Sequence, residues 1–123
     1  MLKSIGFLFL IIILFIGVII VEAEEIITID DLTPIARDML EEDGLNNKLL
    51  SAILNISQEK EAQTVLLPEG VHYFDEKIDL SNLNNLIIDG QDSTFIFTNY
   101  NGGFDFTGSK NVTLKNIKMD FDP

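Results

Sequence analysis

The C-terminal third of the chain contains the passages LSNLNNLIIDG (Leu80–Gly90) and FTGSKNVTLKN (Phe106–Asn116), two versions of one design that lie 26 positions apart. When the two are superimposed, equivalent positions coincide in pairs: Asn85 with Asn111, Leu86 with Val112, Ile88 with Leu114 and, further on, Phe95 with Phe121. A period of about 20 to 30 residues built from short strands indicates a solenoid, in which each repeat buries its apolar face against its neighbours.

The strand pattern supports this interpretation. Runs of about four residues alternate apolar and polar side chains, as strands with one buried face do. These runs cover 64–67, 71–74, 77–80, 86–89, 94–97, 103–106, 112–115 and 118–121. Asn, Gly, Asp and Ser lie between them and tolerate the left-handed backbone of tight corners. The side chains expected to point inward are Leu86, Ile88, Val112, Leu114, Ile117, Met119 and Phe121.

The fold class follows from these runs. We predict a mainly β chain in which 64–123 form about three coils of a partial right-handed parallel β-helix, truncated at the C-terminus. Residues 24–63 are a lead-in that contains two helices. The first helix starts at Thr33-Pro34, a capping residue followed by a proline in the first turn. The second, over 46–57, has an apolar stripe and is predicted to cap the open end of the solenoid.

The N-terminus, residues 1–23, is predicted to be a signal peptide or a membrane anchor. Lys3 precedes a run from Ile5 to Val21 that is apolar except for two glycines, and Val21-Glu22-Ala23 has the small residues of a cleavage site. The run is longer than a usual signal core, so an uncleaved transmembrane helix is the alternative. In either case the remainder is translocated, which predicts a secreted or cell-surface protein that contacts the membrane only through 5–21.

Composition narrows the classes of partner. The 123 residues include 8 Lys and Arg against 20 Asp and Glu, a formal charge of −12. Binding of nucleic acid needs basic clusters, so this partner is not expected. The chain has no cysteine, which excludes disulfides and thiolate metal sites.

The entry segment resembles a known superfamily. TVLLPEGVHY (Thr64–Tyr73), preceded by the helix at 46–57, resembles the start of pectate-lyase-like right-handed parallel β-helices. One additional residue lies between Gly70 and Tyr73 compared with the usual pattern. The passage from Asn116 to Pro123, with its Asp-Phe-Asp-Pro ending, is similar to one in secreted β-helix glycosidases of the α-galactosidase type. The resemblance implies a polysaccharide-active family, with glycosidase or lyase activity and calcium as a cofactor of some members.

The residues themselves show little chemistry. Hydrolysis of a sugar needs two positioned carboxyl groups, and Asp120 and Asp122 are the best local candidates because alternation places them on one face. Their alternative role is that of solvated surface residues. His72 is the only histidine, and we interpret it as structural. No cofactor or metal site is predicted from the residues. Asn85 and Asn111 are interpreted as stacked amides that stabilise a turn.

Two classes of function remain. In the first, the chain is the beginning of an exported polysaccharide-active protein that lacks the catalytic coils and is inactive alone. In the second, it is a non-catalytic surface or adhesive module. Polysaccharide is the partner expected in the first class, whereas the coils of the second would serve as a spacer or a binding face. A stack of strands with an uncovered end also predicts end-to-end association.

Overall fold

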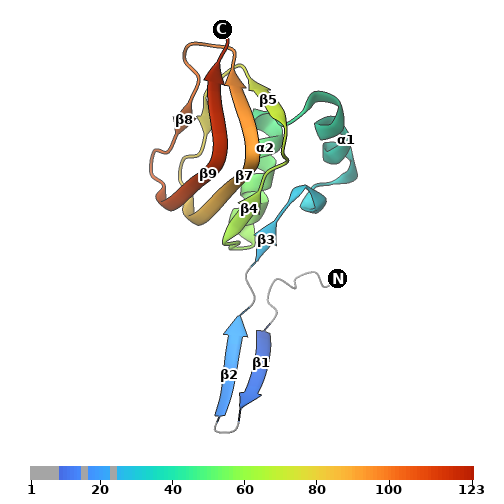
Figure 1. Cartoon of the computed structure of the whole chain (residues 1–123), viewed down its shortest axis with the longest axis vertical. Coiled ribbons are helices and arrows are strands. Elements are labelled where there is room, and N and C mark those ends of the chain that lie inside the picture. Colours follow the sequence, from blue (N-terminus) through green and yellow to red (C-terminus); the bar gives the residue numbers. More distant parts are fainter. Residues whose placement is uncertain (1–8, 15–16, 23–24) are drawn as a thin grey trace.

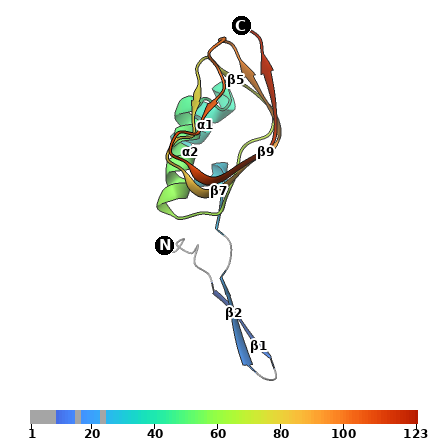
Figure 2. The same ribbon diagram turned by 90° about the vertical axis from the view of Figure 1, so that its left-hand side faces the viewer.

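The computed structural model describes residues 9–14, 17–22 and 25–123. The first two of these ranges form the antiparallel strands β1 (Phe9–Leu14) and β2 (Gly17–Glu22), which pair from Phe9 opposite Glu22 to Leu14 opposite Gly17. This hairpin lies apart from the rest of the molecule (Figures 1 and 2). The main body contains two α-helices and a parallel sheet.

The lead-in forms the elements β3 (Ile26–Ile27), η2 (Ile29–Asp31), α1 (Pro34–Asp43) and α2 (Asn47–Glu59). Both predicted helices are present. The hydroxyl of Thr33 accepts a hydrogen bond from the Ala36 N–H at 3.2 Å, which caps α1. The Asn46 carboxamide accepts one from Leu49 at 2.9 Å and caps α2 in the same way. α2 lies behind the sheet (Figure 1). Its apolar stripe is buried through Leu49, Leu50, Ile53 and Leu54.

The sheet is centred on one long strand, β7 (Asn84–Phe97). On one side β7 pairs in parallel with β4 (Thr64–Leu66) and then with β5 (Val71–Phe74). On the other side it pairs in parallel with β9 (Lys110–Phe121) along most of its length. β3 extends the sheet beyond β4, which gives five strands in all. A separate parallel pair joins β6 (Ile78–Asp79) to β8 (Phe104–Asp105).

The register of β7 and β9 changes partway along the strands. Leu86 lies opposite Val112 and Ile88 opposite Leu114, as the 26-residue alignment predicts. Beyond an irregularity between Asp89 and Ser93, however, Phe97 lies opposite Phe121 and Phe95 opposite Met119. The predicted pairing of Phe95 with Phe121 is therefore wrong. The irregularity inserts two more residues in β7 than in β9, since 89–93 oppose 115–117.

Phenylalanines fill the core on the inner side of the sheet. Phe74, Phe95 and Phe97 are fully buried, and the ring centroid of Phe74 lies 4.8 Å from that of Phe95 and 5.9 Å from that of Phe97. Phe104 and Phe121 extend this row of rings at 5.8 Å and 5.3 Å from Phe97. Leu86 and Ile88 are buried as predicted, whereas Met119 and Phe121 on β9 remain about half exposed.

The predicted fold class is wrong. Strands make up about 40% of the structure and helices 26%, so the chain is mixed rather than mainly β, and its sheets are small and unclosed. The described residues form no right-handed parallel β-helix or other solenoid and do not have the expected pectin lyase fold. The physical reason is the length and pairing of the strands. The segments expected as separate strands at 86–89 and 94–97 belong to the single strand β7, and β6 and β8 pair over only two residues, too few to close a coil.

The predicted signal or anchor helix over 5–21 is also wrong in its secondary structure. Residues 9–14 and 17–22 are strands, and among the described residues no helix has both the length and the apolar character needed to cross a membrane. This stretch is rich in Ile and Val, whose β-branched side chains favour strands. Ala23, after which signal cleavage is predicted, lies outside the described residues.

Candidate functional site

Two adjoining hollows lie where α2 meets the beginning of β7. The first, of about 370 Å³, is lined by Gln58, Glu61, Ala62, Gln63, Asn84 and Asn85. The second, of about 350 Å³, is lined by Gln63, Asn85, Leu86, Ile87, Asn111 and Thr113. Gln63 and Asn85 belong to both. We refer to the combined feature as the amide groove, because five of its lining residues have carboxamide side chains. The volume of each hollow lies at the small end of the range of ligand sites.

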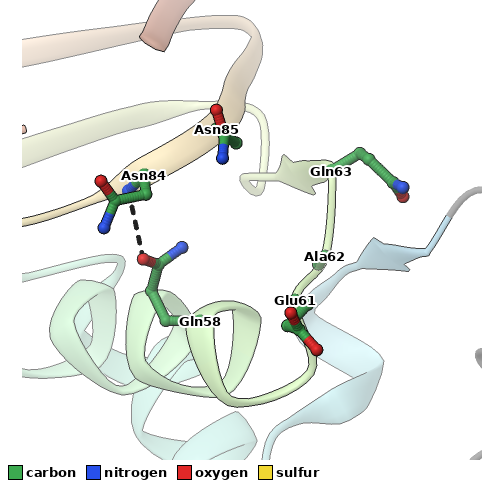
Figure 3. A pocket seen from close by; sticks show the side chains of 6 residues that line it. All are labelled: Gln58, Glu61, Ala62, Gln63, Asn84 and Asn85. Atoms are coloured by element: carbon green, nitrogen blue, oxygen red, sulfur yellow. Dashed lines mark hydrogen bonds between the residues drawn. The ribbon is translucent and has the colours of Figure 1, made fainter. Parts of the chain in front are cut away.

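The amides come from four parts of the fold, namely the end of α2, the residue before β4, the start of β7 and the start of β9. Figure 3 shows those of the first three parts. Gln58 lies in the last turn of α2, and its Oε1 atom accepts a hydrogen bond from the backbone N–H of Asn84 at 3.2 Å. Gln63 directly precedes β4, and its Oε1 atom accepts a bond from the N–H of Glu25 at 2.7 Å. These two bonds hold the helix, the first residues of β7 and the chain before β3 around the groove.

Asn85 and Asn111 form a ladder across the sheet. The Nδ2 group of Asn111 donates a hydrogen bond to Oδ1 of Asn85 at 2.9 Å, which confirms the predicted stacking of amides. Both residues have positive φ, 53° and 56°, a conformation that asparagine tolerates better than most residues. A second rung lies at the irregularity, where Nδ2 of Asn116 donates to Oδ1 of Asp89 at 2.9 Å.

The residues that line the groove include one carboxylate and no Lys, Arg or His. Glu61 is the only titratable side chain among its lining residues, and it is exposed. The carboxylates with perturbed acidity lie elsewhere. The hydrogen bond from Asn116 lowers the pKa of Asp89, helped by the backbone N–H of Gln91 and by the charge of Lys115. The hydroxyl and the N–H of Thr107 lower the pKa of Asp105. The residues that line the groove therefore include no pair of facing titratable groups.

The candidate catalytic residues lie outside the amide groove. Asp120, on β9, and Asp122, just after it, are both exposed, and neither is among the lining residues. Oδ1 of Asp120 accepts a hydrogen bond from the N–H of the adjacent Phe121 at 2.8 Å. In the part of the chain that the structure describes, no group of three or more side chains is arranged to hold a metal ion. The calcium implied by the resemblance therefore has no such group in the described ranges.

His72 has a structural environment. It is 5% exposed, its Nδ1 atom accepts a hydrogen bond from the N–H of Leu45 at 3.3 Å, and Nε2 lies 2.8 Å from the carbonyl oxygen of Pro68. Because Nδ1 accepts, the proton belongs on Nε2, which donates to Pro68. The ring joins the loop after α1 to the turn before β5.

Sequence reasoning missed most of the groove. From the sequence alone, no role in a site was assigned to Gln58, Gln63 or Asn84. The available signal was the number of amides that flank the strands, but their convergence depends on how α2 packs. The chain matched no family model, no curated protein and no solved structure.

Proposed function

We propose that this chain is an exported, non-catalytic module that binds a neutral polysaccharide in the amide groove. The observation that supports the proposal is the group of carboxamides at the start of β7, where Asn84, Asn85 and Asn111 lie on neighbouring strands beside Gln58 and Gln63. Each carboxamide offers both a donor and an acceptor, as each sugar hydroxyl does.

Free hydrogen-bonding groups remain for a ligand. The carboxamide of Asn84 is exposed and has no partner among the described residues, because its bond to Gln58 uses the backbone N–H. In the ladder, Nδ2 of Asn85 and Oδ1 of Asn111 are not used in the bond between these residues. Thr113 adds an exposed hydroxyl at one end of the groove.

Charge favours a neutral sugar over an acidic one. The groove includes Glu61 but no Lys or Arg, and the whole chain has a formal charge of −12. A chain of uronic acids would meet like charge both locally and at long range. Neutral polysaccharides, such as galactans, avoid this repulsion.

A binding experiment tests the proposal. We expect the chain to bind neutral galactan oligosaccharides, measured by calorimetry, and to bind homogalacturonan oligosaccharides more weakly. Asn84→Ala removes a free carboxamide and should weaken galactan binding about five- to tenfold, the effect of one or two hydrogen bonds. Asn101→Ala, which removes an exposed amide far from the groove, is the matched control. Equal affinity of both variants, or no binding of either sugar, would contradict the proposal.

Export is the second part of the proposal and has its own test. The positive start and apolar run before Ala23 support translocation of residues 24–123. Sequencing of the N-terminus of the secreted protein should find Glu24 as the first residue. Recovery of the protein only from the cytoplasm, with Met1 retained, would contradict export.

A further inference from the structure

We propose that the free edge of β9 binds an extended, acidic segment of a partner protein as an additional parallel strand. β9 runs from Lys110 to Phe121, and in the described part of the chain it pairs only with β7. Its other edge therefore presents unpaired backbone groups over a long strand. Such edges are templates for the addition of a strand from another chain.

The side chains show that this edge lacks a covering strand. On β7, the inward residues Phe95 and Phe97 are 1% and 0% exposed. Their register partners on β9, Met119 and Phe121, are 48% and 47% exposed. The two rows occupy equivalent places in the sheet, and the difference is that β7 has a strand on each side. One more strand beside β9, with apolar residues at alternate positions, would cover this row.

The ladder of amides gives the added strand a direction. Asn111 donates from Nδ2 to Oδ1 of Asn85, and its own Oδ1 atom takes no part in that bond. A parallel strand with an asparagine or glutamine at the equivalent corner would continue the ladder by donating to this atom. The corners at Asn111 and Asn116, with φ of 56° and 57°, bend β9 at fixed places, so a partner strand must bend at the same places.

Charge indicates the nature of the partner strand. β9 contains three lysines, Lys110, Lys115 and Lys118, and one aspartate, although the chain as a whole has a formal charge of −12. All three lysines are exposed. Opposite charges directly across a strand pair stabilise it, and like charges destabilise it. The strand therefore selects acidic residues at the outward positions of its partner, and a second β9 from another copy would place lysines near lysines.

Two peptides test this inference. The first has the sequence of residues 110–122 with glutamate in place of each of the three lysines, and the second keeps the lysines. Three opposite-charge pairs should make the glutamate peptide bind the full chain about tenfold more tightly, measured by fluorescence anisotropy. The net charge of the chain attracts the lysine peptide at long range, so this order of affinities reports pairing beside β9 rather than general electrostatics.

Variants of the chain locate the effect. The double variant Lys115→Glu with Lys118→Glu should reverse the order of the two peptides. Lys48→Glu with Lys77→Glu makes the same change of net charge at exposed positions outside β9 and should preserve the order. Circular dichroism establishes that each variant is folded. Tighter binding of the lysine peptide to the unaltered chain, absence of binding by either peptide, or a dimer of the chain that neither peptide dissociates would each overturn the inference.

Discussion

Phe97 and Phe121 offer a matched test of how the sheet is stabilised, because they are register partners on neighbouring strands. Phe97 is fully buried, and its ring lies within 6 Å of the rings of Phe74, Phe104 and Phe121. Phe121 is 47% exposed, and the one ring contact that the described structure shows for it is with Phe97, at 5.3 Å. The same substitution at the two positions should therefore have different costs.

The magnitudes follow from burial. Phe97→Ala removes a fully buried ring and leaves a cavity, which costs about 3–5 kcal/mol of the free energy of unfolding. Phe121 buries about half of its side chain, and full burial of a Phe is worth about 1.5–3 kcal/mol. Phe121→Ala leaves a space that is open to water, so no enclosed cavity forms and the expected cost is about 1 kcal/mol.

Urea denaturation followed by circular dichroism measures both costs, with the slope of the transition checked in each variant. Tyr100→Ala is the control, since this side chain is 85% exposed and its loss should change the free energy of unfolding by less than about 0.5 kcal/mol. Equal costs for the Phe97 and Phe121 variants would refute the reasoning. That result would mean that the β9 side of the sheet is as well covered as the β7 side.

Three further predictions concern the irregularity in β7 and the acidity of the chain. Gly90→Ala should destabilise the protein by about 1–3 kcal/mol in the same urea assay, because a Cβ atom at this position overlaps the side chain of Ile117 and the carbonyl oxygen of Asn116. Ser93→Ala should be neutral or stabilising by up to about 1 kcal/mol, since the buried Ser93 hydroxyl has no hydrogen-bond partner among the described residues; a loss above about 1 kcal/mol would contradict this. The free energy of unfolding should fall as the pH drops below the ordinary Asp pKa of 3.8, because the pKa values of Asp89 and Asp105 are lowered in the folded chain. The two carboxylates stabilise the folded chain above pH 3.8, and this stabilisation is lost as each is protonated. Asp89→Asn should reduce the loss of free energy of unfolding that occurs as the pH falls below 3.8. An unchanged loss in this variant would argue against the Asn116 contact.

Part of the fold was readable from local patterns. The cap at Thr33 predicted the start of the first helix, because a capping side chain bonds to backbone groups only a few residues away. The apolar stripe over 46–57 predicted the second helix close to its observed bounds. The pairing of Leu86 with Val112 and the stacking of Asn85 with Asn111 were also readable, since similar residues recur at a constant interval there. Apart from Asn85 and Asn111, the residues of the candidate site could not be predicted from the sequence.

The N-terminal segment shows where local patterns are ambiguous. An apolar run of this length suits a helix in a membrane, but the same β-branched residues also suit strands. The structure has the hairpin of β1 and β2 in this place. Composition alone does not distinguish a helix from a hairpin here, because both satisfy the backbone hydrogen bonds of the same residues.

The sequence by itself therefore determined the helix starts, the alternation of strand residues, the acidic character and the first half of the β7–β9 register. The tertiary structure decided the rest. The two additional residues of β7 shift Phe121 from Phe95 to Phe97, and their effect depends on how Gly90 packs against Ile117. The packing of α2 brings Gln58 to Asn84, 26 positions away, and so builds the amide groove. Whether strands close into coils or remain an open sheet depends on long-range contacts, which no local pattern of side chains encodes.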